Sequence, residues 1–204
     1  MASRVILLVG CSGSGKSTYA REHFPEAVIV SADHYFEELA TATSQSFEDV
    51  WDLWQLGAAH SQCQQRFLEA ITNNAPIVVV DNTNVRATDR QRYIKKASTF
   101  GLEAELHVFS VWHYGYVAPS GRQITNYINK CHKRNAHGVP REVVAQQFGR
   151  LELPTGIYLA GKPAQFLRPL HQLPATDEPR LGEVGRFHTS HWGPSWSRSP
   201  ASRS

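Results

Sequence analysis

The feature that most constrains the fold is a glycine-rich loop that follows directly on a short apolar run. Residues 10–17 read GCSGSGKS and fit the pattern G-x-x-x-x-G-K-[ST], and residues 5–9 read VILLV. Glycines let the backbone curl so that successive N–H groups point at phosphate oxygens, and a helix that starts there adds its positive dipole end. Strand, loop and helix in this order predict a nucleoside triphosphate site, because a Gly/Ser-rich turn without a ligand would rarely match all these positions.

The side chains of this loop have expected roles at the triphosphate. Lys16 would reach the β- and γ-phosphates, and Ser17 would hold Mg²⁺ through its hydroxyl group. The absence of an N-K-x-D guanine motif mildly favours ATP as the nucleotide. We expect the triphosphate to be bound by Gly10, Cys11, Ser12, Gly13, Ser14, Gly15, Lys16 and Ser17.

Composition limits the size and the environment of the protein. With 204 residues, of which 41% are hydrophobic and 19% charged, the chain can bury one core. A net charge of +3 permits a polyanionic substrate without requiring one. The three cysteines form no C-x-x-C pair, so we expect neither a disulfide framework nor a zinc knuckle. Without an expected signal peptide or a long apolar segment, we predict a cytoplasmic protein that has no contact with membranes.

Short β-prone runs alternate with segments of helical periodicity along the chain. We expect strands at residues 5–9, 27–31, 77–80 and 104–112. We expect helices at residues 16–24, 47–73 (mainly helical), 87–100 and about 123–134, and a further helix from Pro140. This alternation predicts an α/β fold in which helices flank a parallel β-sheet through right-handed crossovers.

Two of these helices carry polar residues whose placement matters. In residues 47–73 the spacing places Leu56, Ala59, Cys63 and Phe67 on one buried face. His60 lies in the same segment; it could bind an acceptor, but a packed histidine is the favoured interpretation. In residues 87–100 the spacing places the basic side chains on the outer parts of the helix; they are Arg90, Arg92, Lys95 and Lys96.

Two aspartates follow strands and are candidates for chemistry. The carboxyl ends of parallel strands meet at one edge of a sheet, so Asp33 and Asp81 should converge on the mouth that Lys16 occupies. Asp33 would act as general base toward an acceptor hydroxyl, or alternatively cap the next helix. Asp81 would help hold Mg²⁺ in the manner of a Walker-B acid. Thr83 and Asn84 could equally bind phosphate or close a turn.

A basic helix end before a Gly/Pro-bounded loop has the character of a mobile lid. Residues 130–134 read KCHKR, and the loop at residues 135–139 precedes Pro140. The guanidinium of Arg134 would stabilise charge on the transferring phosphate, although a basic residue at a helix end can also serve the helix dipole alone. His132 and His137 lack metal-ligand spacing with a third partner, so we predict no zinc site.

The C-terminal region differs in composition from the rest. We expect a kinase domain at residues 1–165 and a poorly ordered tail at residues 170–204, where Pro, Ser, Arg and aromatic residues dominate. The aromatic and basic side chains of the tail could alternatively contact nucleic acid by stacking and charge.

Taken together, these segments resemble the polynucleotide-kinase-like branch of the P-loop kinases. The resemblance rests on residues 10–18, on SADHYF at 31–36, on VDNTN at 80–84 and on KRNAHGVP at 133–140. It implies an α/β P-loop kinase fold with a short helical lid. It also implies that Lys16, Ser17 and Thr18 hold MgATP, that Asp33 activates the acceptor hydroxyl and that Arg134 is the lid arginine.

The resemblance implies a kinase that phosphorylates a hydroxyl group on a nucleic acid, while the acceptor stays open. It could be the 5′-OH end of DNA or RNA, or a hydroxymethylated pyrimidine base in DNA such as 5-hydroxymethyluracil. A base flipped out of a duplex would require stacking aromatic residues near Asp33, for which Tyr35, Phe36 and Tyr114 are the candidates. The alternatives are a nucleotide-binding regulatory module and a kinase of small molecules or nucleosides.

Overall fold

The protein is described by a computed structural model that covers residues 4–111, 120–152 and 185–188. Its centre is a five-stranded sheet with the order β2-β3-β1-β4-β5. The strands are β1 (Arg4–Gly10), β2 (Val28–Val30), β3 (Ile77–Val80), β4 (Ala104–Phe109) and β5 (Gly185–His188). The first four run parallel, and β5 pairs antiparallel with β4. The prediction of an α/β fold with a parallel sheet is therefore confirmed.

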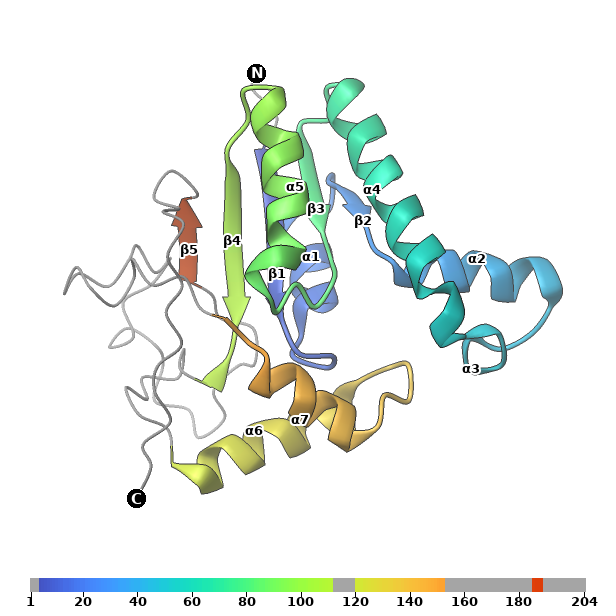
Figure 1. The fold of residues 1–204 in the computed structure, drawn as a ribbon, viewed down its shortest axis with the longest axis vertical. Helices are drawn as coiled ribbons and strands as arrows, with labels where there is room; N and C mark the ends of the chain where they lie inside the picture. The colour runs from blue at the N-terminus through green and yellow to red at the C-terminus, as the bar shows by residue number, and fades with distance from the viewer. Residues whose placement is uncertain (1–3, 112–119, 153–184, 189–204) are drawn as a thin grey trace.

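The helices cover both faces and one end of this sheet (Figure 1). They are α1 (Lys16–His23), α2 (Asp33–Thr43), α3 (Phe47–Val50), the 3₁₀ helix η1 (Leu53–Gln55), α4 (Leu56–Thr72), α5 (Ala87–Thr99), α6 (Gly121–Arg134) and α7 (Arg141–Gly149). Helices α4 and α5 lie in front of the sheet in Figure 1 and α1 lies behind it, while α6 and α7 lie across the end toward which the parallel strands point.

The core consists of three clusters that follow from the alternation of side chains along β1. Val5, Leu7 and Val9 pack toward the side of α2, α4 and α5. Ile6 and Leu8 pack on the opposite side, with the residues of α1. Because both faces are covered, residues 5–9 are at most 1% exposed, which is why this strand is an unbroken apolar run. A third, separate cluster joins Cys11 of the glycine-rich loop to α6 and α7.

The segment at residues 47–73 is not one helix but three pieces. Trp51 and Asp52 adopt extended backbone conformations after α3. The Asp52 side chain then accepts a hydrogen bond of 2.9 Å from the Trp54 N–H and starts η1. Beyond this break, α4 buries Ala59, Cys63 and Phe67 as its spacing predicted, and the partly buried Leu56 packs against the same cluster.

Arg90 corrects the expectation that the basic residues of α5 all lie outward. Its side chain is fully buried and donates hydrogen bonds to the carbonyls of Asn84, Val85 and Glu152 at 2.7, 3.0 and 2.7 Å. Burial lowers the pKa of its guanidinium to about 10. Arg90 therefore holds the connection after β3 against the segment that follows α7, a structural role that helical spacing alone cannot reveal.

Some predictions fall on residues that the structure does not describe. The end of the fourth strand at Trp112, the loop at residues 114–119 and most of the tail lie outside the described residues. Within the tail, the structure describes the strand β5. No helix among the described residues is long and apolar enough to cross a membrane.

Candidate functional site

The glycine-rich loop joins β1 to α1 and is shaped by its glycines. Gly13 has φ +74°, and a Cβ atom there would collide with the carbonyl oxygen of Cys131 in α6. Gly15 has φ 98° and is the N-cap of α1. No side chain of the described residues caps α1, so the N–H groups of its first turn are available for phosphate oxygens. Gly13 and Gly15 thus supply the positive φ angles that a tight glycine-rich loop requires.

Lys16 lies at the centre of this loop. The residue is buried, and its Nζ donates a hydrogen bond of 2.8 Å to the carbonyl oxygen of Cys11. Ser17 and Thr18 are exposed at the start of α1. The Cys11 carbonyl is a neutral acceptor, so it binds an ammonium group less strongly than charged phosphate oxygens would. Lys16 can therefore turn from this carbonyl to a phosphate.

Cys11 contributes its backbone carbonyl group to the loop, and its thiol is not reactive. Its side chain is fully buried in the cluster with α6 and α7. Burial raises the pKa of its thiol to about 12, and nearby Cys131 acts in the same direction. Since the thiolate is the reactive form, Cys11 has no role as a nucleophile.

The two predicted aspartates converge as expected. Asp81 directly follows β3, and its N–H bonds to the Val30 carbonyl at the end of β2, at 2.9 Å. Asn82 adds a second link, because its Oδ1 accepts a hydrogen bond of 2.9 Å from the Ala32 N–H. Asp33 comes immediately after Ala32, so these two bonds hold both aspartates at the same edge of the sheet.

Asp33 is the first residue of α2, but it does not cap the helix. The N-cap is Ala32, and no side-chain capping bond is present. The Asp33 side chain is half exposed, and its Oδ2 lies 3.9 Å from Nε2 of His137 in the loop between α6 and α7. Its carboxylate is thus available at the mouth of the site.

The surroundings of Asp33 favour its protonated form. Loss of hydration raises the pKa of its carboxyl above the ordinary value, and the charges of Asp81 and Glu37 act in the same direction. The charges of His137 and Lys16 oppose this shift. A raised pKa makes a carboxylate a stronger base, as proton abstraction requires.

Asn84 supports the loop rather than facing a ligand. It is buried with φ 46°, and its Nδ2 donates a hydrogen bond of 2.8 Å to the Leu8 carbonyl. The Thr83 carbonyl accepts a bond of 2.9 Å from the Gly10 N–H. Of the two interpretations of Asn84, the structure therefore favours the turn, and residues 83–84 fix the position of the glycine-rich loop.

Helices α6 and α7, the segment for which a lid was predicted, pack against the glycine-rich loop. Besides the contact between Cys131 and Gly13, Oε1 of Gln147 accepts a hydrogen bond of 2.8 Å from the Ser12 N–H. Arg134 is exposed in the last turn of α6, and no hydrogen bond or ion pair of its side chain occurs within the described part of the chain. Its position permits both the lid role and the dipole role.

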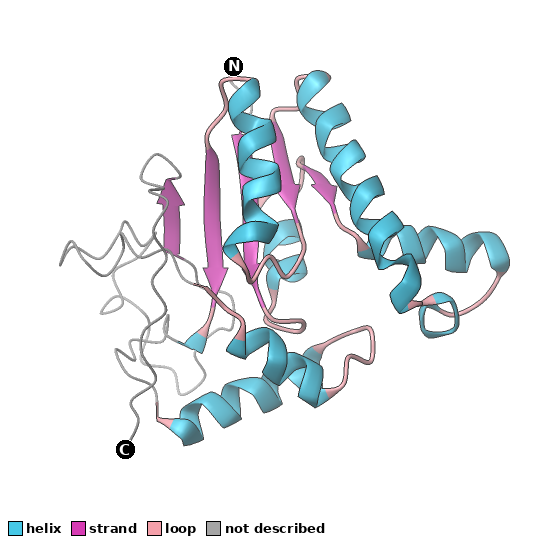
Figure 2. Ribbon diagram, viewed as in Figure 1, coloured by secondary structure: helices cyan, strands magenta, loops and turns pink. Residues whose placement is uncertain are grey.

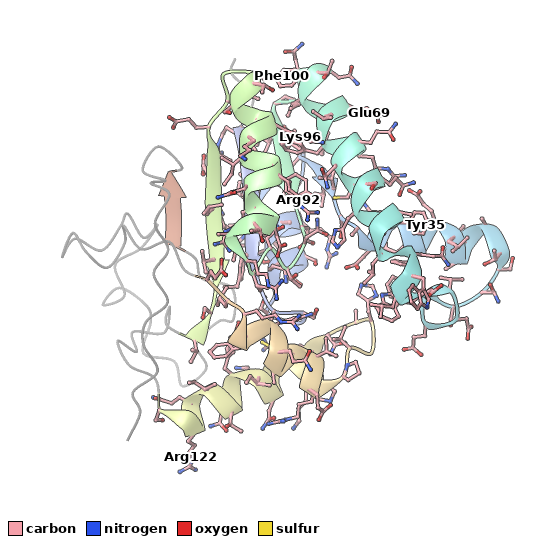
Figure 3. The ribbon with its side chains drawn as sticks, in the orientation of Figure 1. Tyr35, Glu69, Arg92, Lys96, Phe100 and Arg122 are labelled. Atoms are coloured by element: carbon pink, nitrogen blue, oxygen red, sulfur yellow. The ribbon has the colours of Figure 1, made fainter. Side chains whose placement is uncertain are left out.

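His60, which the sequence offered as a possible acceptor ligand, lies within electrostatic reach of Arg92. His60 is exposed rather than packed in the core, which corrects the favoured interpretation. Loss of hydration lowers the pKa of its ring, the Arg92 charge adds to this effect, and the charges of Asp89 and Asp33 oppose it. Figure 3 shows Arg92 on the side of α5 that is turned toward α4. His60 is thus within electrostatic reach of both Arg92 and Asp33.

The three aromatic residues that were candidates for stacking on a flipped base lie in different surroundings. Phe36 is fully buried in the core, so it cannot stack on a flipped base as proposed. Tyr35 is half-buried, and its hydroxyl donates a hydrogen bond of 3.0 Å to Oε1 of Gln55. Tyr114 lies outside the described residues.

The residues present fit MgATP. Free N–H groups of a helix start, a lysine, a hydroxyl and a carboxylate are the donors and ligands that a triphosphate with a hard cation requires. Here they are supplied by α1, Lys16, Ser17 and Asp81. No group of three or more histidine, cysteine or acidic side chains suited to binding a metal by itself occurs among the described residues.

Comparisons with known proteins agree with this geometry. A family model described as an AAA domain matches residues 5–154. NEDD4-binding protein 2 from Homo sapiens is 36% identical over 145 residues, which are 70% of this chain; the match spans only 7% of the length of that protein.

Among solved structures, a chain of the Pnkp1/Rnl/Hen1 RNA repair complex matches with a TM-score of 0.50 at 15% identity, over 74% of this chain and 44% of that chain. A gluconokinase from Sinorhizobium meliloti 1021 matches with a TM-score of 0.41 at 20% identity, over 75% and 77% of the two chains. At 15% identity the likeness to the RNA repair chain concerns the fold alone, and together with the family model it confirms the P-loop kinase fold.

Proposed function

The chain belongs to the AAA domain family, and from this premise we propose that it is a kinase that transfers the γ-phosphate of ATP to a hydroxyl group of a nucleic acid. The observation that carries the proposal is the placement of Asp33. Its half-exposed carboxylate neighbours the loop lysine and has no capping role. A protein that only binds nucleotide has no need of such a base.

The donor side of the reaction would depend on α1 and its loop. The N–H groups of the loop and of the first turn of α1 would bind the phosphates, and Lys16 would turn from the Cys11 carbonyl to the β- and γ-phosphates. Ser17 and Asp81 would hold Mg²⁺, which neutralises charge on the phosphates. Arg134 would add its guanidinium when the lid closes over the transferring group.

The acceptor side would depend on Asp33. As the acceptor oxygen attacks the γ-phosphorus, its proton passes to the Asp33 carboxylate. A new O–P bond forms, the bond between the γ-phosphorus and the bridging oxygen breaks, and ADP leaves with that electron pair. Glu37 and Asp81 raise the affinity of Asp33 for this proton, because both place negative charge near it.

A nucleic acid is the acceptor class that the exposed pair of Arg92 and His60 favours. Arg92 and His60 can hold a phosphate of the acceptor strand, and Arg92 lies on the side of α5 turned toward α4. A similar fold in a chain of an RNA repair complex is consistent with this class. Within it we propose a 5′-OH end of DNA or RNA, or a hydroxymethylated pyrimidine in DNA.

Transfer from γ-labelled ATP tests the proposal. The acceptors are a 5′-OH oligonucleotide, DNA with 5-hydroxymethyluracil, free nucleosides and gluconate. Label on either polymer supports the proposal and identifies the acceptor; label only on a small molecule contradicts it. Asp49→Asn is the control for Asp33→Asn, because Asp49 is exposed and, among the described residues, its side chain bonds only to Ser46 of its own capping box.

A further inference from the structure

The loop between α6 and α7 is held in one shape by its own hydrogen bonds. Nδ2 of Asn135 donates to the carbonyls of His132 and Val139 at 2.6 and 3.1 Å, and its Oδ1 accepts a bond of 2.7 Å from the Val139 N–H. Nδ1 of His132 lies 3.1 Å from the same Val139 carbonyl. The residues between them, His137 included, are therefore presented on a preformed loop.

This loop extends from α6 and α7 toward α3 (Figure 2). The ring of His137 packs on the ring of Phe47 in α3, with centroids 4.1 Å apart and planes 30° apart. Its Nε2 lies 3.9 Å from Oδ2 of Asp33. Gly138, with φ +62°, lies so close to Glu48 that a Cβ there would be 2.9 Å from its Oε1. The lid thus contacts α3 and Asp33 at once.

We propose that His137 is a positioning residue that orients the carboxylate of Asp33 for proton abstraction when the lid is in place. This inference rests on the proposed function, in which Asp33 is the general base. Phe47 holds the plane of the imidazole ring, and Nε2 faces one oxygen of the carboxylate. The other oxygen then stays free for the acceptor hydroxyl.

The need for such a residue follows from the surroundings of Asp33. Among the described residues, its carboxylate accepts no hydrogen bond, and His137 is the side chain in ion-pair range of it. The two side-chain torsions of an aspartate let its carboxylate rotate, and misplacement by about 1 Å can cost about 100-fold in rate. A separation of 3.9 Å is long for a hydrogen bond, but catalytic contacts often tighten only once substrates are bound.

The position of His137 also links the two halves of the site. Helix α6, which precedes this loop, packs on Gly13 of the glycine-rich loop through Cys131. A movement of α6 upon nucleotide binding would therefore be transmitted to the ring beside Asp33. His137 makes acceptor activation depend on the lid.

Kinetics of three variants test the positioning role. We expect His137→Ala to lower kcat about 10- to 100-fold with little change in the KM for ATP. His137→Gln keeps a donor and should recover part of the loss. Lys133→Ala is the control, because Lys133 is exposed just before this loop and its side chain makes no hydrogen bond or ion pair within the described part of the chain. In an Asp33→Asn background, His137→Ala should cause no further loss; an equal loss there, or equal effects of His137→Ala and Lys133→Ala, would overturn the proposal.

Hydrogen exchange of residues 135–139 gives a readout that needs no turnover. His137→Ala and Asp33→Ala should both speed exchange in this loop, whereas His60→Ala should not. Unchanged exchange in both variants overturns the contact between lid and base. If the wild-type protein phosphorylates no acceptor, the proposed function and the positioning role both fail, whereas faster exchange would still establish the contact.

Discussion

Oδ1 of Asn82 accepts a hydrogen bond of 2.9 Å from the N–H of Ala32. This bond joins the residue after Asp81 to the residue before Asp33, so it sets how far apart the two carboxylates lie. The Nδ2 of Asn82 is held in turn by Sγ of Cys63 and the Tyr93 hydroxyl, at 3.4 and 3.3 Å. Side chains of α4 and α5 thus help to fix the spacing of the two aspartates.

Asn82→Ala should therefore reduce stability and turnover together. The N–H of Ala32, a residue that is 5% exposed, loses its partner, and an unpaired buried donor costs about 1–3 kcal/mol of unfolding free energy. Urea unfolding measures this loss, and kcat should fall because Asp33 is no longer fixed. The exposed Asn73→Ala is the control and should stay within about 0.5 kcal/mol of wild type.

Asp33→Asn should raise the thermal stability at neutral pH. The folded-state pKa of Asp33 lies above its ordinary value because of lost hydration, so the folded protein binds this proton more tightly than the unfolded chain. Stability then falls as pH rises from the ordinary aspartate value through the folded-state pKa. Asparagine carries no charge, so it removes the cost of burying the ionised carboxylate. The Tm of the wild type should therefore fall as pH rises through this range, whereas the Tm of the variant should not. An identical pH dependence would contradict the shift.

The raised pKa of Asp33 should also determine the acidic limb of the pH–activity profile. If Asp33 must be deprotonated to accept the acceptor proton, kcat/KM should rise with pH through a pKa above the ordinary value of aspartate. Glu37→Gln removes one neighbouring negative charge and should move this limb toward lower pH. A limb that does not move in this variant would show that another group controls it.

Arg92→Ala should weaken binding of a polynucleotide acceptor and leave ATP binding unchanged. Its guanidinium neighbours His60 and is exposed, as a contact to an acceptor phosphate requires. Loss of one charged contact corresponds to about a tenfold rise in the acceptor KM and a weaker dependence on salt. Lys95→Ala, which removes an exposed cation from the same helix, is the comparison. Equal effects would indicate a diffuse charge effect rather than a site.

Much of this arrangement could be predicted from the sequence, because it depends on local patterns. The glycine-rich loop has fixed residue types, and strands buried on both faces are unbroken apolar runs such as residues 77–80. The convergence of Asp33 and Asp81 followed from the single fact that parallel strands end at one edge. The bond of Asn82 to Ala32 was missed, although its place beside Asp81 was a signal.

The remaining features depend on contacts between distant segments. Arg90 is buried because the Glu152 carbonyl reaches it from beyond α7, and β5 forms by pairing with β4 across the chain. Helical periodicity could not show the break at Asp52, where a side-chain cap overrides the pattern. His60 took part in no recognisable motif, so only the fold could place it near Asp33.

The central claim is that Asp33 directs the γ-phosphate to an acceptor hydroxyl. The most direct measurement is single-turnover transfer from γ-labelled ATP to a 5′-OH oligonucleotide or to DNA with 5-hydroxymethyluracil, with ATP affinity measured in parallel. Wild type should label one of these polymers, and Asp33→Asn should lower that rate by about two to four orders of magnitude with ATP affinity little changed. Lys16→Ala should abolish ATP binding. Undiminished transfer by Asp33→Asn, or label released only as free phosphate by wild type, would contradict the account.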